Sequence, residues 1–260
     1  MRVRLLGAFT ITTLAQGEIR SGLRRKAREL LAFALCHPDG FTAEQAIEAL
    51  WPDGDPAKTP DWYWNAIANL RRVLAQRTAT KKLPSIVRQG TRYRAEQASF
   101  EVDLWRVEAA LAVAHAAARG AAGDEQVMAA LGELASIATG SLLVDADYDW
   151  ARTPREELRR RVADALARLA ELRTAAGDRD GALAVLEQAI DADPTAEELY
   201  RRIMRLQADL GRPDAVRRTY HTLGLRLDEL DLDPEPATER LRAALLTPTP
   251  TRRPPGRPTV

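Results

Sequence analysis

The sequence predicts a mainly α protein in which a small α+β part precedes an all-α part. Strand-like segments at 2–13 and 85–94 enclose three helical segments, and the chain after them is rich in Ala and Leu at helical spacing. Part of that second region repeats every 34 residues. With 260 residues the chain can form two domains, each with its own core. We place the first over 1–98, the second over 99–246 and a disordered tail over 247–260.

Charge is distributed unevenly between these parts. The whole chain has a net charge of only +1. Residues 1–98 contain 16 Lys and Arg against 9 Asp and Glu, a net charge of +7, whereas residues 99–260 contain 22 against 28, a net charge of −6. A basic first part joined to an acidic second part indicates that only the first part faces a polyanion.

The first part begins with a segment that favours β structure. Arg2–Thr13 is rich in β-branched residues and partly alternates, so it predicts one strand, with a turn at Gln16–Gly17 into a second short strand. Leu23–Leu35 follows with helical spacing and a basic start. It ends at His37–Gly40, whose Pro and Gly break a helix.

Two further helices are predicted before the second strand region. Thr42 and Gln45 match a capping box, so the second helix runs from about Ala43 to Trp51. The Pro- and Asp-rich segment 52–60 predicts a loop, and a third helix covers 61–76.

The third helix has one apolar face and one polar face. Ile67, Leu70 and Leu74 recur at helical spacing and form the apolar face. The polar side chains away from it are Asn65, Asn69, Arg71 and Arg72.

A β-hairpin with basic arms is predicted over 85–94, with Gly90 near its turn and Arg88, Arg92 and Arg94 on its strands. Three short helices followed by such a hairpin are the order of a winged helix-turn-helix. In that fold the third helix enters a groove and the hairpin reaches the neighbouring backbone.

The arginines and asparagines of the third helix also have a purely structural interpretation. Arg71 and Arg72 either contact phosphate or are solvated charges near a helix C-terminus. An Asn suits adenine but also caps helices. Arg92 and Arg94 share a strand face and suit phosphate or the minor groove.

The start of the third helix favours packing over base contact. Trp62 and Trp64 are bulky aromatics that more often fill a core or pack on a hairpin or loop than touch a ligand. Ala66 and Ala68 are too short to reach far into a groove. The first half of this helix is therefore less suited to reading bases than its second half.

The second part contains a repeat of two helices. Shifting the sequence by 34 residues aligns apolar with apolar residues and Gly177 with Gly211, which is the tetratricopeptide pattern. Such units bury their faces only by stacking. A degenerate first unit is predicted at about 103–119 and 124–139, and a capping helix at 235–246.

Other classes of protein have little support. Cys36 is the single cysteine, lies in an apolar run and allows no internal disulfide, which fits a reducing compartment. The sequence shows neither a signal peptide nor a membrane span, so we expect a cytoplasmic protein that does not bind membranes. His37, His115 and His221 are scattered, and we find no pattern for a metal, a cofactor or a catalytic nucleophile. We expect no enzyme activity.

Several short motifs together resemble the bacterial transcriptional activator domain proteins, typified by the Streptomyces antibiotic regulatory proteins. They are Arg4–Gly7, Arg25–Leu31, Glu48–Pro52, Asn69–Leu74, Gly211–Arg212 and Leu232–Pro234.

The resemblance implies a winged helix that reads direct repeats in promoter DNA. It also implies a tetratricopeptide-like domain that supports homodimerisation and contact with RNA polymerase. The residues we predict to bind DNA are Arg24, Arg25, Asn65, Asn69, Arg71, Arg72, Arg88, Arg92 and Arg94. The alternative is a protein-interaction adaptor whose winged helix no longer binds DNA specifically and docks a partner through its aromatic side chains.

Overall fold

The computed structural model describes residues 1–13, 17–77 and 86–247, and it forms two compact units, Met1–Ala165 and Leu166–Val260. The boundary between the units falls within helix α6 (Arg152–Ala175). The predicted division at residue 98 is a different one and remains a proposal about functional modules.

A four-stranded sheet opens the first unit. It contains β1 (Arg2–Arg4), β2 (Thr10–Thr13), β3 (Gly17–Glu18) and β6 (Glu101–Val102), in the order β3-β2-β1-β6. The prediction of one strand over 2–13 was wrong, because the chain reverses and β1 pairs antiparallel with β2. Gly7 lies in the reversal with φ +96°, a conformation that L side chains rarely adopt.

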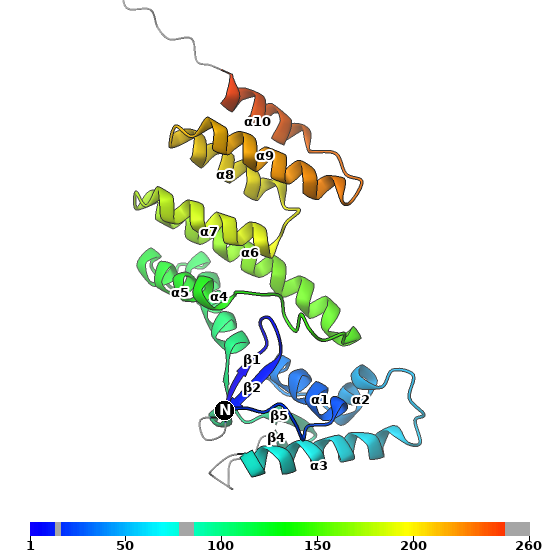
Figure 1. Cartoon of the computed structure of the whole chain (residues 1–260). Coiled ribbons are helices and arrows are strands. Elements are labelled where there is room, and N and C mark those ends of the chain that lie inside the picture. Colours follow the sequence, from blue (N-terminus) through cyan, green and yellow to red (C-terminus); the bar gives the residue numbers. More distant parts are fainter. Residues whose placement is uncertain (14–16, 78–85, 248–260) are drawn as a thin grey trace, which may run out of the picture. The chain divides into compact units, whose positions relative to one another are not determined.

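The winged helix-turn-helix is confirmed as the fold of the first part. Its helices are α1 (Arg25–Cys36), α2 (Ala43–Leu50) and α3 (Thr59–Arg77), and its hairpin is β4 (Ile86–Gln89) with β5 (Arg92–Ala95). Helix α3 begins two residues before the predicted start because Thr59 and Pro60, predicted as loop, form its first turn. Helices α1 and α2 and the hairpin all lie on one side of α3 (Figure 1).

Helix α2 begins with the predicted capping box. The backbone N–H of Gln45 donates to Thr42 Oγ1 at 3.2 Å, and the N–H of Thr42 donates to Gln45 Oε1 at 2.8 Å. Two backbone donors at the start of the helix are thus satisfied by side chains.

The core of this part forms where α1 and α3 face each other and the hairpin. Its fully buried side chains include Leu30, Leu31, Leu35, Tyr63, Ile67, Leu70 and Ile86. Burial of these side chains removes apolar surface from water, at about 25 cal/mol per Å², and holds α3 in place.

The first unit also contains helices α4 (Asp103–Ala118) and α5 (Asp124–Ile137), and short 3₁₀ helices at Gln97–Ser99 and Asp149–Ala151. Strand β6 pairs parallel with β1 and leads directly into α4.

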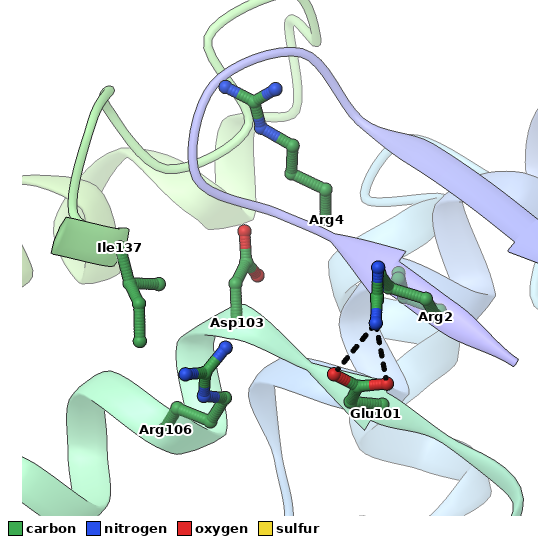
Figure 2. Close-up of a pocket in the computed structure, with 7 residues that line it drawn as sticks. Arg2, Arg4, Glu101, Asp103, Arg106 and Ile137 are labelled. Carbon is green, nitrogen blue, oxygen red and sulfur yellow. Dashed lines mark hydrogen bonds and ion pairs between the residues drawn. The ribbon is translucent and has the colours of Figure 1, made fainter. Parts of the chain in front are cut away.

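The junction between the sheet and α4 is held by polar contacts. The Asp103 carboxylate accepts the backbone N–H groups of Leu5 at 2.8 Å and Leu6 at 3.0 Å. Arg2 and Glu101 form an ion pair at 3.3 Å across β1 and β6. Figure 2 shows both acids beside a pocket of about 320 Å³, which Arg4 and Arg106 also line. Both acids therefore already have partners within the fold.

The second unit contains the end of α6 followed by α7 (Arg179–Ala192), α8 (Glu197–Asp209), α9 (Pro213–Asp228) and α10 (Pro236–Leu246). The repeat of 34 residues is visible in its turns, because Gly177 has φ +85° and Gly211 has φ +70° at equivalent positions. Equivalent positions in the two repeats are buried in the pairs Leu166 and Tyr200, Leu169 and Ile203, and Ala170 and Met204.

Some predictions lie outside the described residues: Gln16 of the first turn, Ser85 of the hairpin, and the tail beyond Thr247. Among the residues that the structure describes, no helix is both long and apolar enough to cross a membrane. The same residues bring together no group of three or more side chains that could bind a metal ion.

Candidate nucleic-acid interface

One face of α3 carries exposed side chains along most of its length. Asp61, Asn65, Ala68 and Arg72 are all exposed, and their spacing of four, three and four residues places them on one face of a helix. Figure 1 shows α3 in cyan, with α1 and α2 on one side of it. The exposed side of the helix is therefore continuous from Asp61 to Arg72.

The centre of this face combines an amide, a small residue and a guanidinium. Asn65 can donate to and accept from a base edge, and Arg72 can donate to phosphate. Ala68 lies between them, and its methyl group allows the helix to approach a partner closely. Asp61, near the N-terminus of α3, is the acidic group on this face.

The hairpin turns its arginines outward. Arg88, Arg92 and Arg94 are exposed, whereas Tyr93 is buried between Arg92 and Arg94 because side chains alternate along a strand. The Arg88 guanidinium donates from Nε to the Gly90 carbonyl at 2.9 Å and lies 5.9 Å from the Tyr93 ring centre.

Two of the predicted arginines already donate to carbonyl groups that join elements of the winged helix. Arg92 Nη2 donates to the Gly40 carbonyl, between α1 and α2. Arg71 Nη2 donates to the Ile86 carbonyl at 3.1 Å and thus ties α3 to β4. Both residues remain exposed, so they keep donors that can face a ligand.

Asn69 lies apart from the exposed face. Its side chain is only 6% exposed, Oδ1 accepts the backbone N–H of Arg24 at 3.0 Å, and Nδ2 donates to the Gly22 carbonyl at 3.4 Å. The prediction that Asn69 contacts a base does not fit this arrangement, because both ends of its amide are used within the fold. The sequence prediction missed this because helical spacing does not show that the 22–24 segment covers the side of α3 that carries Asn69.

The start of α1 adds two exposed arginines, Arg24 and Arg25. The first turn of α1 contains no acidic residue, so the partial positive charge of the helix N-terminus adds to these side chains. Both arginines lie near α3 because Asn69 holds the backbone of Arg24.

Trp62 and Trp64 are more exposed than a core position allows, at 39% and 47%. Of the two roles expected for them, filling the core does not hold, because Tyr63 between them is the residue that is buried. Each still packs on a neighbour: the Trp62 ring centre is 6.4 Å from that of Trp51, and the Trp64 ring centre is 6.0 Å from that of Tyr93. Trp62 thus packs on the C-terminal end of α2, and the packing of Trp64 on the hairpin agrees with the sequence.

The seven arginines around this face share one electrostatic property. Within the described residues none of them forms an ion pair with Asp or Glu; they are Arg24, Arg25, Arg71, Arg72, Arg88, Arg92 and Arg94. Their positive charge is therefore not balanced by a neighbouring carboxylate in the described part of the fold.

Cys36 does not add a nucleophile to this region. Burial, with a smaller contribution from Asp103, raises the pKa of the Cys36 thiol to about 12. The raised pKa favours the neutral thiol, which is a weaker nucleophile than the thiolate.

Comparison with known proteins agrees with this architecture. The family model described as bacterial transcriptional activator domain matches residues 102–246. The solved structure of Mycobacterium tuberculosis EmbR in complex with a low affinity phosphopeptide has a similar fold, with a TM-score of 0.68 and 24% sequence identity. The match covers 94% of this chain and 64% of the EmbR chain. No curated protein matches the chain.

Proposed function

Because this chain belongs to the bacterial transcriptional activator domain family, we propose that its winged helix binds promoter DNA and that its helical region recruits the transcription machinery. Members of this family are transcription regulators and not enzymes. The observation that carries the proposal is the exposed face of α3, flanked by seven arginines without carboxylate partners in the described chain.

In this proposal α3 enters the major groove of double-stranded DNA. Asn65 reads a base edge, and Arg72 contacts a phosphate. The hairpin arginines Arg88 and Arg94 contact the backbone on one side of the groove, while Arg24 and Arg25 contact it on the other. Arg71 and Arg92 support the hairpin and add charge.

The helical region, proposed to cover residues 99–246, has the role of holding protein partners. The family resemblance suggests RNA polymerase and a second copy of the chain. Leu225, Leu230 and Leu232 are each more than half exposed, which supports a protein partner for this region. The proposed place of action is the cytoplasm, where bacterial promoters lie.

The exposed Trp62 and Trp64 favour a second function, that of an adaptor whose α3 docks a protein. In that case capture of a partner survives nuclease treatment and fails when both tryptophans are replaced by Ala. The DNA proposal predicts that the same double substitution leaves most DNA affinity in place.

Selection of duplexes from a random-sequence library, followed by titration of the selected duplex at several salt concentrations, tests the proposal. We expect tight binding at low salt and a linear fall of log K with log salt concentration, by about 0.9 per phosphate contact. A chain that enriches no duplex and binds none at low salt would contradict the proposal.

A further inference from the structure

The segment between β3 and α1 lies directly on α3. Gly22 has φ +95°, and a Cβ added there would lie 3.5 Å from Val73 Cγ1. Asn69 and Val73 are one helical turn apart, so they form one side of α3. The backbone of 22–24 therefore contacts α3 along this side.

Asn69 completes the N-terminus of α1 from another helix. Arg24 is the N-cap of α1 and its own side chain makes no capping hydrogen bond. In α2 the N-cap N–H of Thr42 is accepted by Gln45 of the same helix. In α1 the corresponding N–H, that of Arg24, is accepted by Asn69 Oδ1 at 3.0 Å. One half of a capping box is thus supplied by α3.

The contact between Asn69 and the 22–24 segment is suited to keep the N-terminus of α1 at a fixed distance from α3. Asn69 is almost fully buried, and its Nδ2 donates to the Gly22 carbonyl two residues before Arg24. Loss of a buried amide leaves its former partners unsatisfied, which costs more than the hydrogen bond itself contributes.

We propose that Asn69 is a positioning residue that holds Arg24 and Arg25, at the start of α1, at a fixed distance from the DNA-facing side of α3. The inference rests on the proposed DNA binding. If the N-terminus of α1 is already fixed, its arginines bind phosphates without a further loss of backbone conformational entropy. A mobile N-terminus of α1 would therefore lower the affinity for any duplex.

Asn65 provides a matched control, since it is the same residue type one turn earlier on α3 and is exposed. The experiment compares Asn69→Ala with Asn65→Ala in the full chain, by NMR hydrogen exchange of the Arg24 amide. We expect exchange about fivefold to tenfold faster in Asn69→Ala, from the loss of one hydrogen bond, and unchanged in Asn65→Ala.

DNA titration separates positioning from base contact. With a random-sequence duplex, Asn69→Ala should bind several-fold more weakly than the wild type. With a selected duplex, Asn65→Ala should lose about tenfold or more, because one base contact is removed.

Asn69→Asp is the rescue variant, because it keeps an acceptor for the Arg24 amide but loses the donor to Gly22. We expect it to restore slow exchange at Arg24, with circular dichroism confirming that each variant is folded. The proposal is overturned if Arg24 exchange is unchanged in Asn69→Ala, or if it accelerates while affinity for the random duplex stays at the wild-type value. If the wild type binds no DNA, the proposed function fails, and the exchange data still decide whether Asn69 holds α1.

Discussion

Many arginines of the second unit have carboxylate partners, whereas the exposed arginines around α3 and the hairpin have none among the described residues. In the second unit, Arg201 contacts Glu198 and Glu235 at 2.8 and 2.6 Å, and Arg202 contacts Glu171 at 2.6 Å. Around α3 and the hairpin, seven exposed arginines have no such carboxylate partner among the described residues.

The contrast teaches that the net charge of +1 averages over two regions in which arginine has different roles. In one region arginine forms internal ion pairs, and in the other it lacks a carboxylate partner. In the second unit acids lie three or four residues away on the same helix or on a neighbouring helix, so arginine links elements within the fold. In the first 98 residues acids are too few, so positive charge is left over.

The largest expected effect comes from removing unpaired arginines. The triple variant Arg72→Ala, Arg88→Ala, Arg94→Ala should bind its selected duplex about 10²-fold more weakly at 0.1 M salt, and its salt slope should fall by roughly 2.7, or 0.9 for each lost phosphate contact. Fluorescence anisotropy across salt concentrations measures both quantities.

The matched control removes the same charge from the second unit, with Arg212→Ala, Arg217→Ala and Arg226→Ala. Each of these arginines has a carboxylate partner. We expect its affinity to stay within about twofold of wild type, because long-range charge is screened. Equal losses in the two triple variants would show that net charge alone drives binding, and the contrast between the regions would not hold.

A smaller effect is expected on the free energy of unfolding. Here the arginine substitution in the second unit should have the larger effect, and the one near α3 the smaller. The Arg201 side chain is 13% exposed and donates to Glu198, Glu235 and Thr238. Arg201→Ala should lower the free energy of unfolding by about 2 kcal/mol, and Arg94→Ala, which is exposed, by less than about 0.5 kcal/mol. Urea denaturation followed by circular dichroism measures both values. If Arg201→Ala and Arg94→Ala lowered the free energy of unfolding equally, the ion pairs of the second unit would contribute little to stability.

The smallest expected effect is on how stability changes as the pH falls below about 5. Burial favours a higher pKa for Glu198, but hydrogen bonds from Arg201 and Arg202 outweigh it and lower the pKa below the ordinary value. A depressed carboxyl pKa contributes stability above the unfolded pKa, near about 4.3, and that stability is lost as pH falls through the folded pKa.

Thermal unfolding between pH 5 and pH 3 tests this contribution. Glu198→Gln should lower the melting temperature at pH 5 and flatten its decline toward pH 3. Glu187→Gln, at an exposed position of α7, is the control and should follow the wild-type profile. If the melting temperature of Glu198→Gln fell with pH in parallel with that of the wild type, a depressed pKa of Glu198 would be contradicted.

Most secondary structure could be predicted because its causes are local. The capping box at Thr42, the hairpin around Gly90 and the two 34-residue repeats are confirmed. Each depends on residues within one element or one repeat. The division of Arg2–Thr13 into two strands was missed because local alternation did not show that the chain reverses around Gly7 and pairs β1 with β2.

The candidate site was predicted less completely. Asn65 and Arg72 are exposed on α3 as helical spacing indicated, and their DNA contacts remain a prediction. Asn69 fits the same pattern but is buried, because the 22–24 segment covers it. Trp62 and Trp64 are exposed because Tyr63 alone turns toward the core.

The sequence by itself determined the order of helices and strands, the repeat, and the excess of positive charge in the first 98 residues. These follow from spacing, capping and composition, which act over a few residues or over a whole segment. Only the tertiary structure decided which polar side chains stay free. Arg72 and Asn69 are three residues apart on one helix, yet one faces solvent and the other holds α1, because burial depends on the segment that packs against each.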